Sequence, residues 1–263
     1  MSAPKVLVIG EKFIDRYWLG SASRLSPEAP LPVVKIEDEP LQFMGGAANV
    51  AENLRVLGCQ VRELYQPGHY PIKNRLVANG TQVARWDQYD SVDPIKFSNS
   101  TAINHLFEGI DGVVISDYNK GAITSELVAI VGDKTRDKKI FIDTKSSPSS
   151  YGILARQATF FPNVKEYAQF TAAYDAMPVK VLKMSEHGMT YQNRSTSIHQ
   201  PALAKRVNNV SGAGDTAVAA YTYAILSGKE PKDALEFAAR ACAVVVGKPY
   251  TGTADHGEIL SIT

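Results

Sequence analysis

The sequence predicts an α/β protein with a central, mostly parallel sheet, helices on both faces and a small β lid. The first observation is a series of short, continuous apolar runs, such as Gly-Val-Val-Ile-Ser at 112–116, as is typical of buried parallel strands. The second is that these runs alternate with segments of helical periodicity, which favours right-handed βαβ units. The third is a group of β-like segments, about 12–20, 33–37 and 72–88, that stands outside this alternation and supplies the lid.

The elements follow from local signals in chain order. Helix 45–57 is expected to stop at Gly58, and the helix from residue 212 is followed by a second helical run after Gly228-Lys229-Glu230-Pro231. The remaining strands of the central sheet are expected at 5–10, 61–65, 139–143, 159–162 and 179–184, and the remaining helices at about 94–107, at 124–136 and briefly from Val164.

The lid segments carry their own turn signals. Asn79-Gly80 is the strongest short hairpin signal and divides 72–88 into two runs. The proline-rich piece 26–32 leads directly into the run at 33–36, and we interpret it as a rigid approach to the accessory sheet rather than a linker. Without a repeat or a low-complexity tract, residues 1–263 are expected to form a single domain.

Composition excludes several classes of function. The 263 residues are 44% hydrophobic and 21% charged, and the formal net charge is +1, so no global field favours nucleic acid or a membrane as a partner. The presence of only two cysteines suits a reducing cytosol. No apolar run approaches the length of a membrane span, and the apolar run within the first ten residues is too short for a signal peptide. The five histidines show no metal-site spacing. We therefore expect a cytoplasmic protein with small-molecule partners.

The stretch Val-Ser-Gly-Ala-Gly-Asp-Thr at 210–216 points to chemistry. Gly212, Ala213 and Gly214 leave the first N–H groups of a helix bare, and the helix dipole makes them an anion site. Asp215 would repel that anion unless it removes a proton from a hydroxyl while the N–H groups hold the arriving phosphoryl group. Close helix packing explains the small residues equally well, whereas a dinucleotide fingerprint fits poorly because no strand follows the helix.

Polar residues at the ends of the predicted strands indicate that the site lies at the carboxyl edge of the sheet. In parallel sheets, ligands bind at the carboxyl ends of the strands. Those ends carry Asp117, Asp143 with Lys145, Asn163 with Glu166, and Ser185 with Glu186.

Three stretches together resemble the ribokinase-like (PfkB) carbohydrate kinases: Gly212-Ala213-Gly214-Asp215, Gly45-Gly46-Ala47-Ala48-Asn49, and Pro162-Asn163-Val164-Lys165-Glu166. Within this family the chain is most similar to the D-glycero-β-D-manno-heptose 7-phosphate kinases of lipopolysaccharide-core biosynthesis, the kinase domains of ADP-heptose synthesis enzymes. The residues that carry this similarity are 15–18, 23–34, 116–118 with Lys120-Gly121, and 244–248.

The resemblance implies a ribokinase-like fold and an ATP- and Mg²⁺-dependent kinase that phosphorylates the anomeric hydroxyl of heptose 7-phosphate to the 1,7-bisphosphate. It also implies a homodimer through the lid. The alternatives are another sugar or nucleoside kinase of the family, or a catalytically weak sugar- or nucleotide-binding relative.

The implied site has four parts. Catalysis falls to Asp215 with the N–H groups of Gly212, Ala213 and Gly214. The other residues are Asn163, Val164, Lys165, Glu166, Ser185, Gly188 and Lys248 for the nucleotide, Asn163 and Glu166 for Mg²⁺ through water, and Asp15, Gly45, Gly46, Asn49, Lys73 and Arg75 for the sugar phosphate.

Plainer interpretations stay open for several of these residues. Glu166 with Asn163 would make an ordinary helix start, as would Gly45-Gly46. Lys73 and Arg75 lie two apart on one strand face and can reach one phosphate, or can form a solvated hairpin face. Lys248 would otherwise be a surface lysine.

The chain also departs from the family pattern. Only Gln66-Pro67-Gly68-His69 joins the strand at 61–65 to Tyr70, where the family has a strand-helix-strand segment. Five single residues also differ from the family pattern. Glu11 stands in place of an early Asp, Thr144 in place of a Pro, and Asn209 in place of an Asp. Ser211 stands in place of a Thr, and Ala239 in place of a nucleotide-side Asn.

Overall fold

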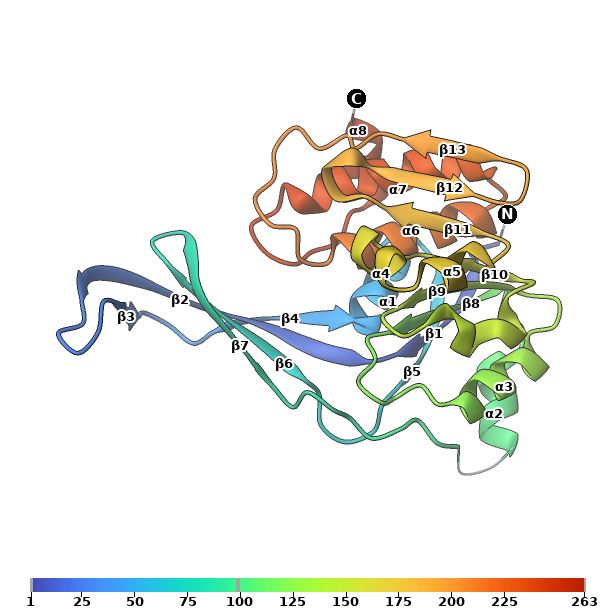
Figure 1. Ribbon diagram of the computed structural model, residues 1–263, viewed down its shortest axis with the longest axis horizontal. Coiled ribbons are helices and arrows are strands. Elements are labelled where there is room, and N and C mark those ends of the chain that lie inside the picture. Colours follow the sequence, from blue (N-terminus) through green and yellow to red (C-terminus); the bar gives the residue numbers. More distant parts are fainter. Residues whose placement is uncertain (1, 98–99, 263) are drawn as a thin grey trace.

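The computed structural model describes residues 2–97 and 100–262, and these form two sheets (Figure 1). The larger sheet has the strand order β13-β12-β11-β10-β9-β8-β1-β5, in which the strands from β11 to β5 run parallel and β12 and β13 are antiparallel. The predicted ribokinase-like α/β class, with its mostly parallel sheet, is confirmed.

The strands of this sheet are β1 (Lys5–Gly10), β5 (Gln60–Tyr65), β8 (Gly112–Asp117), β9 (Lys139–Thr144), β10 (Ala158–Phe160), β11 (Lys180–Lys183), β12 (Met189–Gln192) and β13 (Ser197–Gln200). The helices are α1 (Ala47–Val56), α2 (Ser100–Phe107), α3 (Ser125–Lys134), α4 (Val164–Gln169), α5 (Thr171–Asp175), α6 (Ala213–Leu226), α7 (Pro231–Val246) and α8 (His256–Ser261), with 3-10 turns at Pro148–Leu154 and Ser185–His187.

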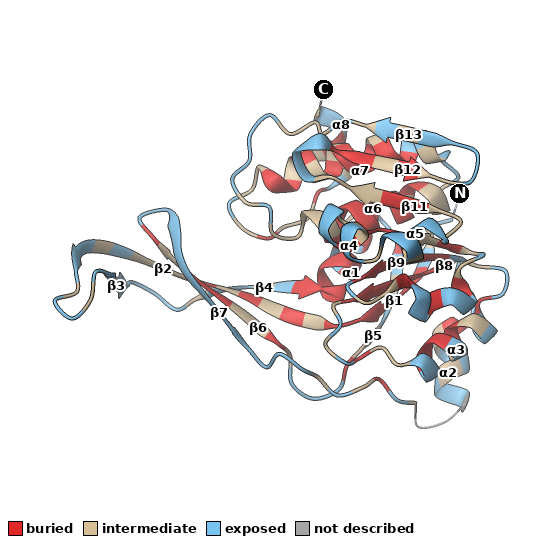
Figure 2. Cartoon of the chain, in the orientation of Figure 1, coloured by how far each residue is buried: buried red, intermediate tan, exposed pale blue. Residues whose placement is uncertain are grey.

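Alternate residues of each buried strand enter two different cores. Val6 and Val8 of β1 pack with α1, α6, α7 and α8 on one face of the sheet. Leu7 and Ile9 pack with α2, α3 and Tyr174 of α5 on the other face. Both faces of the inner parallel strands are therefore covered, which explains the continuous apolar runs of β1 and β8, and Figure 2 shows these strands as buried.

The second sheet extends from the body of the molecule as the lid (Figure 1). Its strands are β2 (Lys12–Leu25), β3 (Pro32–Ile36), β4 (Leu41–Gly46), β6 (Ile72–Ala78) and β7 (Thr81–Gln88). The hairpin between β6 and β7 turns at Asn79 and Gly80, whose φ angles of 50° and 80° are those that the Asn-Gly signal predicts. Strand β4 was not predicted, and β2 is longer than the segment 12–20.

Two predicted helix starts are wrong. The helix expected at 45–57 begins at Ala47, because Gly45 and Gly46 continue β4 and pair with Phe13 and Lys12. The helix expected at about 94–107 begins only at Ser100, and residues 98–99 of that prediction lie outside the described part of the chain. Before it, the N–H of Ile95 donates to Ala122 O at 3.0 Å, so this segment is extended along the loop after β8.

The join between β5 and β6 is short and well bonded. Gln66 is 3% exposed, and its side chain accepts from the Lys12 N–H at 2.9 Å and donates to the Lys12 carbonyl at 2.5 Å. This residue therefore ties the end of β5 to the start of β2, where the chain passes from one sheet to the other. No helix within the described residues is long and apolar enough to cross a membrane.

Candidate active site

Asp215 lies in the first turn of α6 and is 5% exposed. Its Oδ1 accepts a hydrogen bond of 2.6 Å from the Tyr118 hydroxyl, and its Oδ2 accepts one of 3.0 Å from Asn49 Nδ2. Burial raises the pKa of Asp215, and the two hydrogen bonds act in the opposite direction. A carboxylate has about four acceptor positions, so this one can still accept from a substrate hydroxyl.

The start of α6 is open on one side. Gly212 has a φ of 82°, and a Cβ at this position would lie 2.7 Å from Asn49 Nδ2, so glycine permits the close approach of Asn49. Among the described residues no side chain caps the helix. A Cβ on Gly214 would meet only the Lys183 ammonium, at 3.7 Å. Bare N–H groups with a cation in front of them make a site for an anion.

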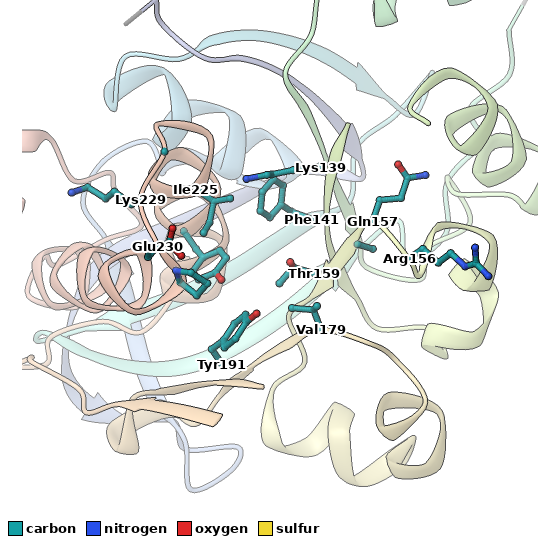
Figure 3. Close-up of a pocket in the computed structure, with 14 residues that line it drawn as sticks. Lys139, Phe141, Arg156, Gln157, Thr159, Val179, Tyr191, Ile225, Lys229 and Glu230 are labelled. Atoms are coloured by element: carbon teal, nitrogen blue, oxygen red, sulfur yellow. The ribbon is translucent and has the colours of Figure 1, made fainter. Parts of the chain in front are cut away.

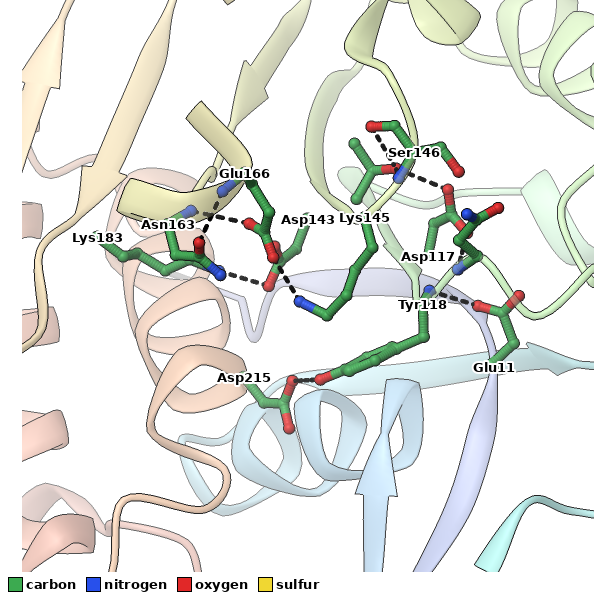
Figure 4. Close-up of polar contacts among 12 residues, drawn as sticks. Glu11, Asp117, Tyr118, Asp143, Lys145, Ser146, Asn163, Glu166, Lys183 and Asp215 are labelled. Atoms are coloured by element: carbon green, nitrogen blue, oxygen red, sulfur yellow. Dashed lines mark hydrogen bonds and ion pairs between the residues drawn. The ribbon is translucent and has the colours of Figure 1, made fainter. Parts of the chain in front are cut away.

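Asn163 and Glu166 form a capping box at the start of α4. The Glu166 N–H donates to Asn163 Oδ1 at 2.9 Å, and the Asn163 N–H donates to Glu166 Oε2 at 2.8 Å. The plainer interpretation of this pair as a helix start therefore holds. The other oxygen, Glu166 Oε1, accepts from Lys145 Nζ at 2.5 Å and faces the interior of the site, as Figure 4 shows.

A second ion pair lies beside the first. Lys183 Nζ contacts Asp143 Oδ2 at 2.6 Å, while Asp143 Oδ1 is buried and has no hydrogen-bond partner among the residues that the structure describes. Burial lowers the pKa of Lys145, but the carboxylates of Asp143 and Glu166 outweigh burial and raise it overall. Lys145 is therefore a cation.

The oxygen set fits Mg²⁺ held through water. The orphaned Asp143 Oδ1 and the buried Glu166 carboxylate offer acceptors on the same edge of the sheet. Across the described chain, no three His, Cys, Asp or Glu side chains are grouped tightly enough to ligate a metal directly. A magnesium ion that keeps most of its water and binds substrate phosphates needs no such group.

The predicted sugar side lies on the lid. Asp15 of β2 and Arg75 of β6 form an ion pair and are 4% and 8% exposed. Lys73 Nζ lies over the Phe13 ring, 3.4 Å from its centroid, and 4.9 Å from that of Tyr118. Burial lowers the pKa of Lys73 to about 8, while Asp15 and Asp215 act to raise it. Of the two cations expected to reach one phosphate, Arg75 is already paired with Asp15, while Lys73 forms no ion pair with any described residue.

Other predicted residues have partners within the protein. A Cβ on Gly45 would lie 2.6 Å from Asp15 Oδ2, and one on Gly46 would lie 2.5 Å from the Phe13 ring, so both glycines make room for lid side chains. The Asn49 amide bonds Asp215 and Asn53.

On the nucleotide side, five predicted residues lie in local structure. Gly188 follows the turn that begins at Ser185, and a Cβ there would meet Gln200 O at 2.1 Å. Lys248 Nζ bonds Thr253 O at 2.6 Å and Glu258 at 2.7 Å. Val164 and Lys165 are exposed on the first turn of α4.

Tyr118 is the main residue that sequence reasoning did not place in the site. Its ring packs edge-on against Phe13 at 4.8 Å, with the Lys145 ammonium 5.1 Å from its centroid, and its hydroxyl reaches Asp215 (Figure 4). Glu11 fixes the backbone at this point, because its buried carboxylate accepts from the N–H groups of Tyr118 and Lys120. The available signal was the position of Tyr118 one residue after a buried strand ends.

Comparison with known proteins agrees with this geometry. Residues 157–256 match the model of the pfkB family carbohydrate kinases. This part of the chain belongs to that family.

Curated relatives match nearly all of this chain. It is 33% identical over 311 residues to the bifunctional protein HldE of Helicobacter pylori (strain HPAG1). The matched region covers 98% of this chain and 66% of that protein. With HldE of Pseudomonas fluorescens (strain Pf0-1) the identity is 32% over 301 residues, covering 97% and 62%. The chain thus spans somewhat less than two thirds of these relatives. Since the matched spans exceed 263 residues, the relatives carry residues without a counterpart here.

Solved structures show the same fold at low identity. The ribokinase of Arabidopsis thaliana complexed with ribose and ATP has a TM-score of 0.73 at 15% identity, covering 100% of this chain and 99% of that one. Phosphofructokinase-2 from Escherichia coli in complex with potassium has a TM-score of 0.74 at 14% identity, covering 100% and 98%.

Proposed function

We propose that this protein is an ATP-dependent kinase that phosphorylates the anomeric hydroxyl of D-glycero-D-manno-heptose 7-phosphate, giving the 1,7-bisphosphate for lipopolysaccharide-core synthesis. The observation that carries the proposal is Asp215, a buried carboxylate at the uncapped start of α6, with Lys183 facing the same helix start. The choice of heptose rests on the similarity of residues 15–34 to heptose kinases.

In this proposal Asp215 is the general base. Its carboxylate takes the proton of the sugar hydroxyl as that oxygen attacks the γ-phosphorus of ATP. The N–H groups at Gly212, Ala213 and Gly214 hold the charge on the transferred phosphoryl group, and ADP leaves. Asn49 and Tyr118 orient the carboxylate through their hydrogen bonds to its two oxygens.

The edge formed by β9, β10 and α4 would hold the nucleotide phosphates. Lys183 and Lys145 are cations placed to face them, and Glu166 and Asp143 would bind the water shell of Mg²⁺. When bound, Mg²⁺ neutralises charge on the phosphates. Asn163 supports this role indirectly, because its cap fixes the orientation of Glu166.

Lys73 would bind the phosphate that the sugar already carries. Its ammonium forms no ion pair with any residue that the structure describes, and its neighbours Asp15 and Arg75 neutralise each other. Asp15 would then accept from sugar hydroxyls with the oxygens that Arg75 leaves available.

A substrate panel tests the proposal. Heptose 7-phosphate, fructose 6-phosphate, ribose and adenosine are compared at equal concentration with Mg-ATP, and ADP release is measured. We expect the highest kcat/KM for the heptose. A best rate with ribose or adenosine would refute the heptose assignment and leave only the family-level activity. Tight binding of ATP and sugar without turnover would instead favour the catalytically weak relative that the short join at Gln66–His69 suggests.

We also propose a cytoplasmic homodimer that pairs through the lid. The free thiols Cys59 and Cys242 suit a reducing compartment. The lid exposes large apolar side chains, including Leu25 (66%), Met44 (50%) and Trp86 (42%). Exposed apolar residues are usually scattered singly, whereas several on one sheet are typical of an interaction surface. Light scattering should give twice the chain mass for the wild type and the chain mass for a Met44→Glu/Trp86→Glu variant. The matched change Ile153→Glu, at a residue 66% exposed outside the lid, should leave the dimer intact. A wild type of monomer mass would refute the dimer.

A further inference from the structure

A cavity of about 350 Å³ opens at the amino ends of β9 and β10, where the turn between α6 and α7 covers it (Figure 3). The residues of the proposed active site lie at the carboxyl ends of the same strands. Ile225, which lines the cavity, is ten residues beyond Asp215 on α6, which corresponds to about 15 Å along the helix. The cavity is therefore separate from the catalytic edge.

The floor of the cavity is aromatic and contains an unpartnered hydroxyl. Phe141, Tyr191 and Tyr221 line it, and the rings of Phe141 and Tyr221 lie 6.5 Å apart in an edge-on arrangement. Tyr221 is 2% exposed as a residue, and its hydroxyl, which is not among the fully buried polar atoms that lack a partner, makes no hydrogen bond to any other residue that the structure describes. Such a group gains a hydrogen bond when a ligand offers it an acceptor.

The rim of the cavity is basic. Lys139, Arg156 and Lys229 line it, and within residues 2–97 and 100–262 none of their side chains forms an ion pair. Glu230 is the one carboxylate among the lining residues. Three cations against one acid give a local excess of positive charge in a chain whose net charge is only +1. This excess favours a ligand with an anionic group.

We propose that this cavity is a second ligand site, which binds a small aromatic anion distinct from the kinase substrates at the active site. The ring of the ligand packs against Phe141, Tyr191 and Tyr221. An acceptor atom of the ligand accepts a hydrogen bond from the Tyr221 hydroxyl. The phosphate or carboxylate of the ligand lies among Lys139, Arg156 and Lys229. The volume is within the range of small-molecule sites.

Calorimetric titration of the whole protein tests the site with three probes: adenosine 5′-monophosphate, 4-hydroxybenzoate and ribose 5-phosphate. The first two probes are both aromatic anions, one with a phosphate and one with a carboxylate, so they show which anionic group the site prefers. The third probe is an anion without an aromatic ring. Each is titrated with the active site saturated by Mg-ADP. We expect at least one aromatic probe to bind, and ribose 5-phosphate to bind at least about tenfold more weakly, because it cannot use the aromatic floor.

Two variants locate the binding. The triple change Lys139→Gln/Arg156→Gln/Lys229→Gln should raise the Kd of the aromatic probe by about tenfold or more, and Tyr221→Phe by about two- to tenfold. The matched triple Lys35→Gln/Lys96→Gln/Arg24→Gln removes the same charges elsewhere and should leave the Kd unchanged. Absence of saturable binding, an equal effect of both triples, or preference for ribose 5-phosphate would overturn the proposal.

The result is independent of the proposed kinase reaction. Asp215→Asn removes the proposed base but leaves every lining residue of the cavity, so probe binding should persist in that variant. Retained turnover in Asp215→Asn would count against the proposed base, whereas loss of probe binding in the same variant would count against a separate cavity site, so failure of one proposal can be told from failure of the other.

Discussion

Replacing Tyr118 by Phe should move the pH dependence of the reaction upward. The substitution keeps the ring that packs against Phe13 and removes only the hydroxyl, which donates to Asp215 Oδ1 at 2.6 Å. A hydrogen bond to a charged group is worth about 1.5–3 kcal/mol, and one pKa unit corresponds to about 1.4 kcal/mol. The pKa of Asp215, which burial already raises, should therefore rise by about one to two further units.

The direction of the rate effect follows from the role of the base. Only deprotonated Asp215 can accept the sugar proton, so the acidic limb of the kcat/KM profile should shift by about one to two pH units toward alkaline pH. Well above that limb the carboxylate is ionised in both proteins, and their rates should converge. A coupled assay of ADP release from pH 5 to 9 measures both features.

Tyr151→Phe is the matched control. Tyr151 is also buried and donates a 2.6 Å hydrogen bond to a carboxylate, but that carboxylate is Asp117. This variant should lose stability without any shift of the acidic limb. An unshifted limb in Tyr118→Phe, or equal shifts in both variants, would refute the role given to Tyr118.

Three further predictions test other parts of the site. Asp215→Asn should lower kcat by about 10²- to 10⁴-fold while calorimetry still detects ATP and sugar binding; near-normal kcat would remove Asp215 from catalysis. Glu166→Gln should raise the Mg²⁺ concentration needed for half-maximal rate and leave sugar affinity unchanged, whereas an unaltered Mg²⁺ titration would make Glu166 a helix cap only. Lys73, whose pKa burial lowers to about 8, is charged below that pH and neutral above it. The KM for a sugar phosphate should therefore rise as pH passes through about 8, with no such rise for an unphosphorylated sugar or for Lys73→Met.

Much of the fold could be predicted from the sequence because its signals are local. A short apolar run such as Gly-Val-Val-Ile-Ser predicts a strand from a few residues, and a turn such as Asn79-Gly80 predicts a hairpin in the same way. The placement of Asp215 in the first turn of α6, and of Asn163 and Glu166 at the start of α4, follows for the same reason. Residues at the ends of neighbouring parallel strands are then brought together by the sheet, since Ser116 pairs with Asp143 in register.

The wrong predictions lie where tertiary contacts override the local pattern. Pro94 reads as a first helical residue, but Ile95 is 4% exposed in a core and its N–H pairs with the 120–122 loop. Strand β4 escaped prediction because Leu41-Gln-Phe-Met-Gly-Gly does not alternate, and pairing with β2 creates it. The environment of Lys73 could not be predicted at all, since Phe13 and Tyr118 meet it only through the register of β2 with β6 and the folding of the loop after β8.

The geometry explains how the shortened segment after β5 can leave the site complete. The short join follows β5, which is the edge strand of the central sheet on the side opposite β13. The position of Lys73 depends instead on β2 and β6, whose parallel pairing sets Lys73 opposite Asp15 and Arg75 opposite Tyr17. Gln66 bonds both backbone groups of Lys12, so the start of β2 is held although the join is short. The short join therefore lies at the edge of the sheet, and the contacts of Lys73 with the lid and of Tyr118 with Asp215 are formed with this join in place.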